Sequence, residues 1–247
     1  METIEKFLQE VESYREKPII GSLLVVISYT HFEKLLDFYI SEGIQTFCLD
    51  YHLRTPLNTG AAQNLETLHA FLRRQNLTPL LYAINVNIGR PRKREQAITA
   101  KDLFSFEYGI DILGNIHIQR PLPEEVRERL KPTETIRILN KDDYGYYRIS
   151  DTETISKVYP RDTGVKLDLI ISGSYNFRKM VARAFNMEQI NRECYKIREK
   201  VSEHELTNYL NKKKYVQKDD IEKMVKFKKR VTSRKPSEPS FKLEEFL

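Results

Sequence analysis

The feature that most constrains the fold is the alternation of short apolar runs with helical segments in the first half of the chain. The runs are rich in Leu, Ile and Val and span residues 23–27, 44–49, 80–86 and 110–113. Runs of this length and composition are typical of strands in a parallel sheet. Amphipathic stretches separate them, with Thr30 and Asn64 as candidate helix caps and a third helix at 100–108. This order predicts βαβ units, and hence an α/β fold that is either a piece of a barrel or an open, doubly wound sheet.

Helices dominate the prediction for the second half of the chain. Residues 142–147 combine two Asp and one Gly with three Tyr, which indicates a turn or hairpin. Residues 121–134 are polar and bounded by Pro, as in a connection with a short helix. Further helices are expected at 177–201, 203–212 and 219–229. We divide the chain into a βα domain at 1–201 and a basic helical arm with a mobile tail at 202–247.

Composition predicts the class of protein and the cellular compartment. Hydrophobic residues make up 40% and charged residues 31% of the chain, as in globular proteins. The early apolar run at 19–27 is interrupted by Gly21 and Ser22 and is too short to span a membrane. The only two cysteines, Cys48 and Cys194, cannot form a disulfide framework or a Cys-rich zinc site. We therefore expect a cytoplasmic protein with no membrane contact.

Basic residues are concentrated in one stretch. Between Lys196 and Pro236, fourteen Lys and Arg outnumber six Asp and Glu, a formal charge of +8, so the remainder of the chain carries −2 of the total +6. A localised basic segment is expected of a protein that binds a phosphate backbone. The predicted RNA contacts here are Lys212, Lys213, Lys214, Lys228, Lys229 and Arg230. A pair of solvated charged helices has the same composition, so charge alone leaves both interpretations open.

Candidate site residues follow the predicted strands, where parallel α/β proteins place their sites. Asp50 and His52 are the best catalytic pair that the sequence offers, and a loop hydrogen bond is the structural alternative. A second set follows the next strand and can bind phosphates or remain solvated: Arg90, Arg92, Lys93 and Arg94. The cluster of Tyr144, Tyr146 and Tyr147 can stack on unpaired bases or belong to a core.

Three stretches carry a family resemblance. The first runs through residues 79–113 and ends on the Gly-Ile-Asp-Ile-Leu string at 109–113. The second is the aromatic segment 143–149, and the third is the helix that opens with Arg-Ala-Phe-Asn-Met at 183–187. In this order they resemble the tRNA-guanine transglycosylases, which exchange a guanine in tRNA for a deazaguanine base, and in particular the archaeal, archaeosine-forming branch. The resemblance falls on the C-terminal half of the family's barrel and implies a partial, TIM-barrel-like parallel sheet.

The chain departs from this family at the residues that carry its chemistry. The family nucleophile is an Asp three residues after the position that is Asp111 here, and this chain has Gly114, which cannot attack an anomeric carbon. The family's zinc motif needs three Cys and one His. Residues 149–186 contain no cysteine, and Phe185 stands at the histidine position. We therefore expect no zinc, no other cofactor and no catalysis by this chain alone.

The resemblance and these departures together suggest a non-catalytic subunit in tRNA deazaguanine (archaeosine) modification. Such a subunit would bind tRNA and support a catalytic or complementary protein subunit. A partial barrel leaves sheet edges unpaired, so we expect an oligomer. Two alternatives stay open: an enzyme that processes nucleosides or bases with Asp50, and a structural interaction protein with no role in RNA binding.

Overall fold

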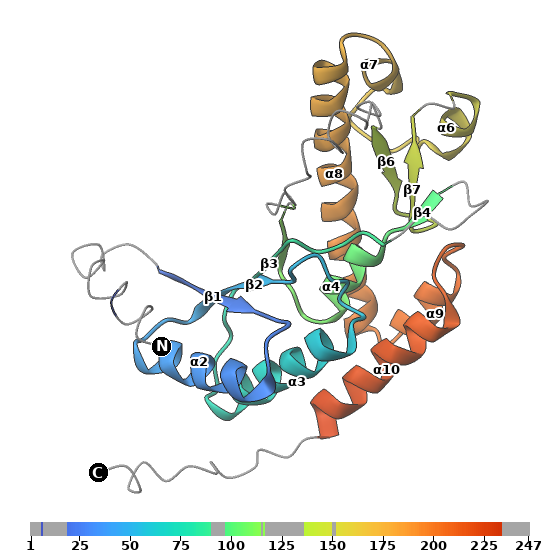
Figure 1. Ribbon diagram of the computed structural model, residues 1–247. Coiled ribbons are helices and arrows are strands. Elements are labelled where there is room, and N and C mark those ends of the chain that lie inside the picture. The colour runs from blue at the N-terminus through green and yellow to red at the C-terminus, as the bar shows by residue number, and fades with distance from the viewer. Residues whose placement is uncertain are drawn as a thin grey trace, which may run out of the picture.

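Two β-sheets share one long helix in the computed structural model of the chain (Figure 1). The structure describes residues 19–89, 97–114, 136–149 and 152–233, together with Lys6 and Ile116. The strands are β1 (Ile20–Leu24), β2 (Thr46–Asp50), β3 (Leu81–Ile84), β4 (Ala97–Thr99), β5 (Ile112–Leu113), β6 (Arg137–Asn140) and β7 (Gly145–Arg148). The helices are α2 (Tyr29–Ser41), α3 (Thr59–Arg74), the tight turn η2 (Lys101–Leu103), α4 (Phe104–Glu107), α6 (Thr152–Val158), α7 (Leu167–Ile171), α8 (Tyr175–Ser202), α9 (Leu206–Asn211) and α10 (Lys218–Ser233).

The larger sheet has four parallel strands in the order β1-β2-β3-β5. Its middle row pairs Ser22 with Cys48, Cys48 with Tyr82, and Tyr82 with Ile112. Successive crossovers move in one direction, so connections of the same hand place their helices on one side of the sheet. Figure 1 shows α2 and α3 together beneath it. The predicted α/β class and parallel sheet are confirmed, and in the described part of the chain the sheet stays open without closing into a barrel.

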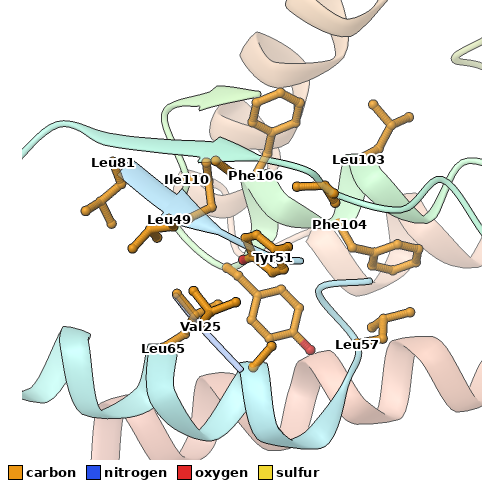
Figure 2. Close-up of a cluster of buried hydrophobic side chains, with 14 of the residues drawn as sticks. Val25, Leu49, Tyr51, Leu57, Leu65, Leu81, Leu103, Phe104, Phe106 and Ile110 are labelled. Carbon is orange, nitrogen blue, oxygen red and sulfur yellow. The ribbon is translucent and has the colours of Figure 1, made fainter. Parts of the chain in front are cut away.

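The sheet face that contacts α2 and α3, here called the covered face, is a dense apolar core. Its strand residues are all buried: Gly21, Leu23, Phe47, Leu49, Leu81 and Ala83. They pack against Phe32 and Leu36 of α2 and Leu65 of α3. Figure 2 shows Leu49 and Leu65 meeting in the layer between strands and helix. Full burial of an apolar side chain contributes roughly 1.5–3 kcal/mol, so this layer is the main source of stability.

The opposite face of the same sheet, here called the open face, stays in contact with solvent. Its side chains are all at least partly exposed: Ile20, Ser22, Leu24, Thr46, Cys48, Asp50, Tyr82, Ile84 and Ile112. Ile20 is 50% exposed and Ile112 is 46% exposed. Parallel sheets are ordinarily covered on both faces. Among the described residues, no layer therefore packs against the open face in the way that α2 and α3 pack against the covered face.

The smaller sheet is antiparallel, has the order β4-β7-β6, and was not predicted. It separates two apolar clusters, because neighbouring residues of a strand point to opposite faces. Ile98, Leu139 and Tyr146 face the large cluster that includes the covered face. Ala97, Ile138 and Tyr147 face a smaller cluster that α7 and the first half of α8 complete. The hairpin predicted at 142–147 is confirmed as the β6–β7 turn.

The helix α8 is 28 residues long and contributes to both clusters. Ala182 and Phe185 near its start pack into the smaller cluster. Cys194 and Ile197 near its end pack into the larger one. Its N-cap Ser174 accepts a hydrogen bond from the backbone N–H of Phe177, which satisfies one of the unpaired donors of the first turn. This confirms the helix predicted at 177–201.

The helices α9 and α10 pack on the α/β core and do not form a separate arm. Leu206 and Leu210 of α9 and Met224 and Phe227 of α10 are buried in the large cluster. The Phe227 ring lies 4.2 Å from that of Tyr108, measured between centroids. Figure 1 shows α10 running alongside α3. The predicted arm from residue 202 onwards thus shares the large cluster with the βα part, and its predicted mobile tail at 234–247 lies outside the described residues.

The beginning of α3 also differs from the prediction. Asn58 caps this helix, six residues before the predicted cap Asn64. Asn64 lies within α3 and is buried, and its amide donates to the carbonyls of Val25 (3.0 Å) and Ile27 (2.9 Å). Backbone carbonyls that leave a strand inside a protein need a donor. Asn64 is therefore a link between α3 and the end of β1.

Candidate functional site

Left-handed backbone turns shape the carboxyl end of the parallel sheet. His52 and Leu53 follow β2 and Asn85 follows β3, with φ angles of 45°, 60° and 55°. Such angles are unfavourable for residues that carry a Cβ. Asp50 supports this geometry, because its Oδ1 accepts hydrogen bonds from the backbone N–H of His52 (2.8 Å) and from Nδ2 of Asn85 (2.9 Å). The Asp50 carboxylate thus ties the ends of β2 and β3 together.

The predicted catalytic pair is joined through the backbone of His52 and not through its imidazole. The His52 side chain is exposed, and its ring forms no hydrogen bond to Asp50 in the described part of the chain. This arrangement matches the loop hydrogen bond that the sequence left as an alternative. A catalytic role for the pair stays a prediction. Arg90, Arg92, Lys93 and Arg94, the basic residues predicted after the next strand, lie outside the described residues.

Position 114 has no room for a side chain. A Cβ on Gly114 would lie 2.3 Å from the hydroxyl oxygen of Tyr82, whose ring fills the adjacent space on the open face. Asp111, three residues earlier, accepts hydrogen bonds from the backbone N–H of Leu81 (2.9 Å) and from Nη2 of Arg198 (2.8 Å). Asp111 therefore links the start of β3 to α8. A carboxylate at position 114 would require Tyr82 to move.

The tyrosine cluster belongs to the core, which was one of its two predicted roles. Tyr144, Tyr146 and Tyr147 are all buried, so their rings cannot stack on bases. The hydroxyl of Tyr146 donates to Asp102 (2.6 Å) and that of Tyr144 donates to Glu193 (2.7 Å). Burial raises the pKa of Asp102 to about 6, although the bond from Tyr146 opposes the shift. These tyrosines carry hydrogen bonds from the smaller sheet into the large cluster.

Lys213 is buried, which corrects its predicted role as a phosphate contact. It is 6% exposed, and its Nζ donates to the hydroxyl of Tyr209 (2.6 Å) and the carbonyl of Lys141 (2.8 Å). The same ammonium lies 4.9 Å from the Tyr144 ring centroid and 3.6 Å from Oε1 of Glu193. Burial lowers the pKa of Lys213, and Glu193 opposes that shift. An ammonium held inside the protein in this way cannot reach a phosphate at the surface.

A buried polar cluster extends inward from Lys213. Neither oxygen of Glu107 and neither polar atom of the Gln189 side chain has a hydrogen-bond partner among the described residues. Burial raises the pKa of Glu107 well above its usual value, and the nearby charge of Glu193 raises it further. The folded protein therefore favours the neutral acid at Glu107. Unpaired buried groups of this kind are costly and are found in small numbers in native proteins.

A charged groove of about 440 Å³ opens above this cluster, between the β6–β7 turn, α8 and α9. We call it the α8–α9 groove. Its lining residues are Lys141, Asp142, Asp162, Arg192, Glu193, Lys196, Tyr209, Lys212 and Lys213. Besides Lys213, whose ammonium is bonded inside the protein, four of them are basic and three are acidic. A volume of this size admits a small ligand or a short stretch of a polymer backbone, and the excess of cations favours an anionic one.

The remaining predicted RNA contacts lie on or after α9. They are Lys212, Lys214, Lys228, Lys229 and Arg230. All but Lys228 are exposed, and Lys228 is half-buried. Arg230 donates to Oε1 of Glu66 on α3 at 3.3 Å. The structure thus brings Lys212 to the α8–α9 groove and places Lys228, Lys229 and Arg230 on a different helix.

Sequence reasoning missed three cations of the groove, namely Lys141, Arg192 and Lys196. Their positions follow from contacts between the β6–β7 turn and α8, about 50 residues apart in the chain. The one local signal was the i,i+4 spacing of Arg192 and Lys196 on the predicted helix. That spacing is common on solvated helices, so it could not single out a groove.

Comparisons with known proteins found no relatives. No family model matches the chain, and neither the curated proteins nor the solved structures contain a significant match. Across the described residues, no three His, Cys, Asp or Glu side chains are grouped as a metal ion would require. Within the same residues, no helix is both long enough and apolar enough to cross a membrane. The fold and the α8–α9 groove therefore carry the functional argument.

Proposed function

We propose that the chain is a non-catalytic, transglycosylase-like subunit in tRNA deazaguanine (archaeosine) modification, which binds tRNA and supports a catalytic partner. The observation that carries the non-catalytic role is Gly114 itself, which offers no nucleophile, in a position where the Tyr82 hydroxyl occupies the space that a Cβ would need. The parallel sheet with helices on one side is consistent with part of a barrel. The family assignment itself rests on the sequence resemblance.

The open face supports the need for a protein partner. Exposed apolar side chains from three strands lie on it, including Ile20, Tyr82 and Ile112. The outward carbonyl of Ser22 on the edge strand β1 already accepts a hydrogen bond from the Tyr39 hydroxyl at 3.1 Å. An occupied edge is a poor template for another strand. The partner therefore covers the face of the sheet and does not extend its β1 edge.

Exposed cations support tRNA binding. Lys212 and Lys214 are exposed on either side of the buried Lys213, and both are free to reach phosphates. Arg192 and Lys196 add two further cations in the α8–α9 groove. Contacts of this kind are insensitive to sequence and supply affinity and orientation. Recognition of the base then belongs to the catalytic partner.

The test is tRNA affinity measured across a salt series. Replacing Lys212 and Lys214 with alanine should weaken binding to all tRNAs and make the log–log salt dependence shallower by about one to two units, since each phosphate contact contributes roughly 0.7 to 0.9. The matched control replaces Lys34 and Lys166, two exposed lysines on other elements, and should leave the slope unchanged. If the Lys212/Lys214 variant keeps the wild-type slope, these lysines are not the RNA contacts, and absence of salt-sensitive binding altogether favours a structural interaction protein.

A stand-alone nucleoside- or base-processing enzyme that uses Asp50 is the second candidate. The observation in its favour is the left-handed backbone at His52, Leu53 and Asn85, because such strain tends to gather at functional sites. Guanine exchange into tRNA by the pure chain, lost in Asp50→Asn, would establish this candidate. We expect no exchange by the pure chain.

A further inference from the structure

The α8–α9 groove already holds an anion in its own structure. Oδ2 of Asp162 lies 2.7 Å from Nη1 of Arg192 and 3.9 Å from Nζ of Lys141. Asp162 precedes α7 in a loop, whereas Lys141 belongs to the β6–β7 turn and Arg192 to α8. A carboxylate beside two cations from separate elements marks a position that favours negative charge, and Nζ of Lys141 also pairs with Oδ1 of Asp142 at 3.1 Å.

The cations of the groove are held in place from below. Nη2 of Arg192 donates to Oε1 of Glu188 at 2.7 Å, which fixes one edge of the guanidinium and leaves the other directed at Asp162. The backbone carbonyl of Lys141 accepts a hydrogen bond from the buried ammonium of Lys213. Arg192 is thus held by the partly exposed Glu188, and the backbone of Lys141 is held by the buried Lys213. Preorganised donors of this kind lose little freedom on binding a ligand.

The carboxylate of Asp162, in contrast, can leave without unfolding its loop. Its side chain is 59% exposed. The neighbouring Thr163 and Gly164 are bonded to Glu188, through Oγ1 (2.6 Å) and the backbone N–H (3.2 Å). The loop thus stays attached to α8 while the Asp162 side chain rotates into solvent. An exposed ion pair contributes about 1 kcal/mol or less, so a stronger anion can displace it.

We propose that the α8–α9 groove binds a phosphate group, which takes the place of the Asp162 carboxylate between Arg192 and Lys141. Phosphate offers more acceptor oxygens and more charge than a carboxylate, and guanidinium binds it through two parallel hydrogen bonds. The ammonium of Lys212 at the rim forms no hydrogen bond or ion pair with any described residue and supplies a further cation. Asp162 then competes with the phosphate for the same cations, and a ligand binds only if its affinity for them exceeds that of the Asp162 carboxylate.

The inference deepens the proposed function where RNA supplies the phosphate, but it does not depend on RNA. The same chemistry is offered by a phosphodiester of an RNA backbone and by a free phosphorylated small molecule. A backbone phosphodiester carries one charge and is held by its neighbours along the strand. A free diphosphate carries more charge and can enter the groove alone. Separate binding measurements with the two probes therefore distinguish the sources.

The experiment is calorimetric titration of the full chain with inorganic pyrophosphate, and in a second arm with a short single-stranded RNA that lacks terminal phosphates. Arg192→Gln should weaken binding about tenfold or more, because it removes a charge-assisted pair. Asp162→Asn should strengthen binding about two- to fivefold, because it removes the competitor while keeping the shape of the side chain. The control Arg183→Gln, an exposed arginine of α8 outside the groove, should leave affinity unchanged.

The two variants are expected to change the binding affinity in opposite directions, so each of them can overturn the inference. Unchanged or weaker binding in Asp162→Asn would show that Asp162 does not occupy the anion position. An Arg192→Gln variant that retains full affinity would exclude the groove. Failure of both probes to bind at millimolar concentration would also overturn the proposal. If pyrophosphate binds and responds as expected while tRNA binding is absent, the inference stands and the proposed function fails.

Discussion

The two faces of the parallel sheet come from the same strands and have opposite environments. Phe47 and Leu49 point to the covered face and are fully buried, whereas Cys48 between them points to the open face and is half-exposed. On the covered face, side chains increase stability by removing apolar surface from water. On the open face, Ile20 and Ile112 leave about half of their surface in water. Sheet geometry alone therefore does not determine stability, because the layer packed against each face decides what its residues contribute.

Polar residues in the buried core and polar residues on the open face also differ in what they contribute. Glu107 of α4 and Gln189 of α8 are buried away from the open face with polar atoms that have no partner among the described residues, so their effect is on the free energy of unfolding. On the open face, Asp50 is bonded to backbone and amide donors at the sheet end and remains partly accessible. Changes to these buried residues should therefore alter stability, and changes on the open face should alter packing and access.

The largest effect is expected at Gly114, where the Tyr82 side chain occupies the space that a new side chain would need. Gly114→Asp should lower the free energy of unfolding by about 1–3 kcal/mol, because the new side chain overlaps the Tyr82 ring. Urea denaturation measures this loss. Tyr82→Ala in the same chain should recover part of it, since the small side chain opens the space.

The control for this variant is Gly164→Asp, because a Cβ at Gly164 meets nothing within 4 Å. Its stability should stay within about 0.5 kcal/mol of wild type. If Gly114→Asp is equally mild and Tyr82→Ala gives no recovery, Tyr82 does not block position 114. The non-catalytic argument would then rest on the absent side chain of Gly114 alone.

A smaller effect is expected at the buried Glu107. It faces Glu193 of α8, Lys213, and Asp220 and Lys228 of α10. The pKa of Glu107 is raised in the folded protein above its usual 4.5, so its contribution to stability is full below pH 4.5 and is lost as pH rises towards the folded value. Glu107→Gln mimics the neutral acid. It should raise the free energy of unfolding by about 1–2 kcal/mol at pH 8 and change it little at pH 4.

Denaturation curves at the two pH values give this comparison directly. Glu222→Gln, an exposed change on α10, serves as the control and should behave as wild type at both. A Glu107→Gln chain that is less stable at pH 8 than at pH 4, relative to wild type, would mean that Glu107 is ionised and paired in the folded protein.

The smallest effect is the difference in reactivity between the two cysteines. Cys48 on the open face should react with a maleimide about five to ten times faster than the buried Cys194 in the isolated chain, because only the exposed thiol is reached without unfolding. Burial raises the pKa of both thiols, so the comparison is made at one mildly alkaline pH. Single Cys→Ser variants assign the two rates by mass spectrometry. A partner that covers the open face should protect Cys48, and equal rates in the isolated chain would show that the open face is already covered.

Local sequence signals were sufficient for the central strands and the long helices, whereas the first strand was predicted at 23–27 and is found at Ile20–Leu24. The strands β2 and β3 lie inside the apolar runs predicted at 44–49 and 80–86, apart from the terminal residue Asp50. The helices α8 and α10 match the predicted segments within about four residues at each end. These elements are defined by periodicity along the chain, which sequence reasoning detects well.

Elements defined by distant contacts could not be predicted in this way. The short strand β4 exists because Ile98 pairs with Tyr146, 48 positions later in the chain. Lys213 has the sequence context of a surface lysine, with basic neighbours on both sides. Tyr209 lies only four residues before it, whereas only the fold brings Glu193 to it. Charge counting therefore assigned one lysine of the basic segment to the wrong environment, and RNA binding by the other basic residues stays a prediction.

The sharing of α8 between two cores has a mechanical consequence. A helix of this length is about 42 Å long and behaves as a stiff rod. Phe185 anchors it in one cluster and Ile197 in the other, and Arg192 projects into the groove between these two points. A load applied at Arg192 is therefore distributed to both anchors, and any tilt of the rod must displace both clusters together.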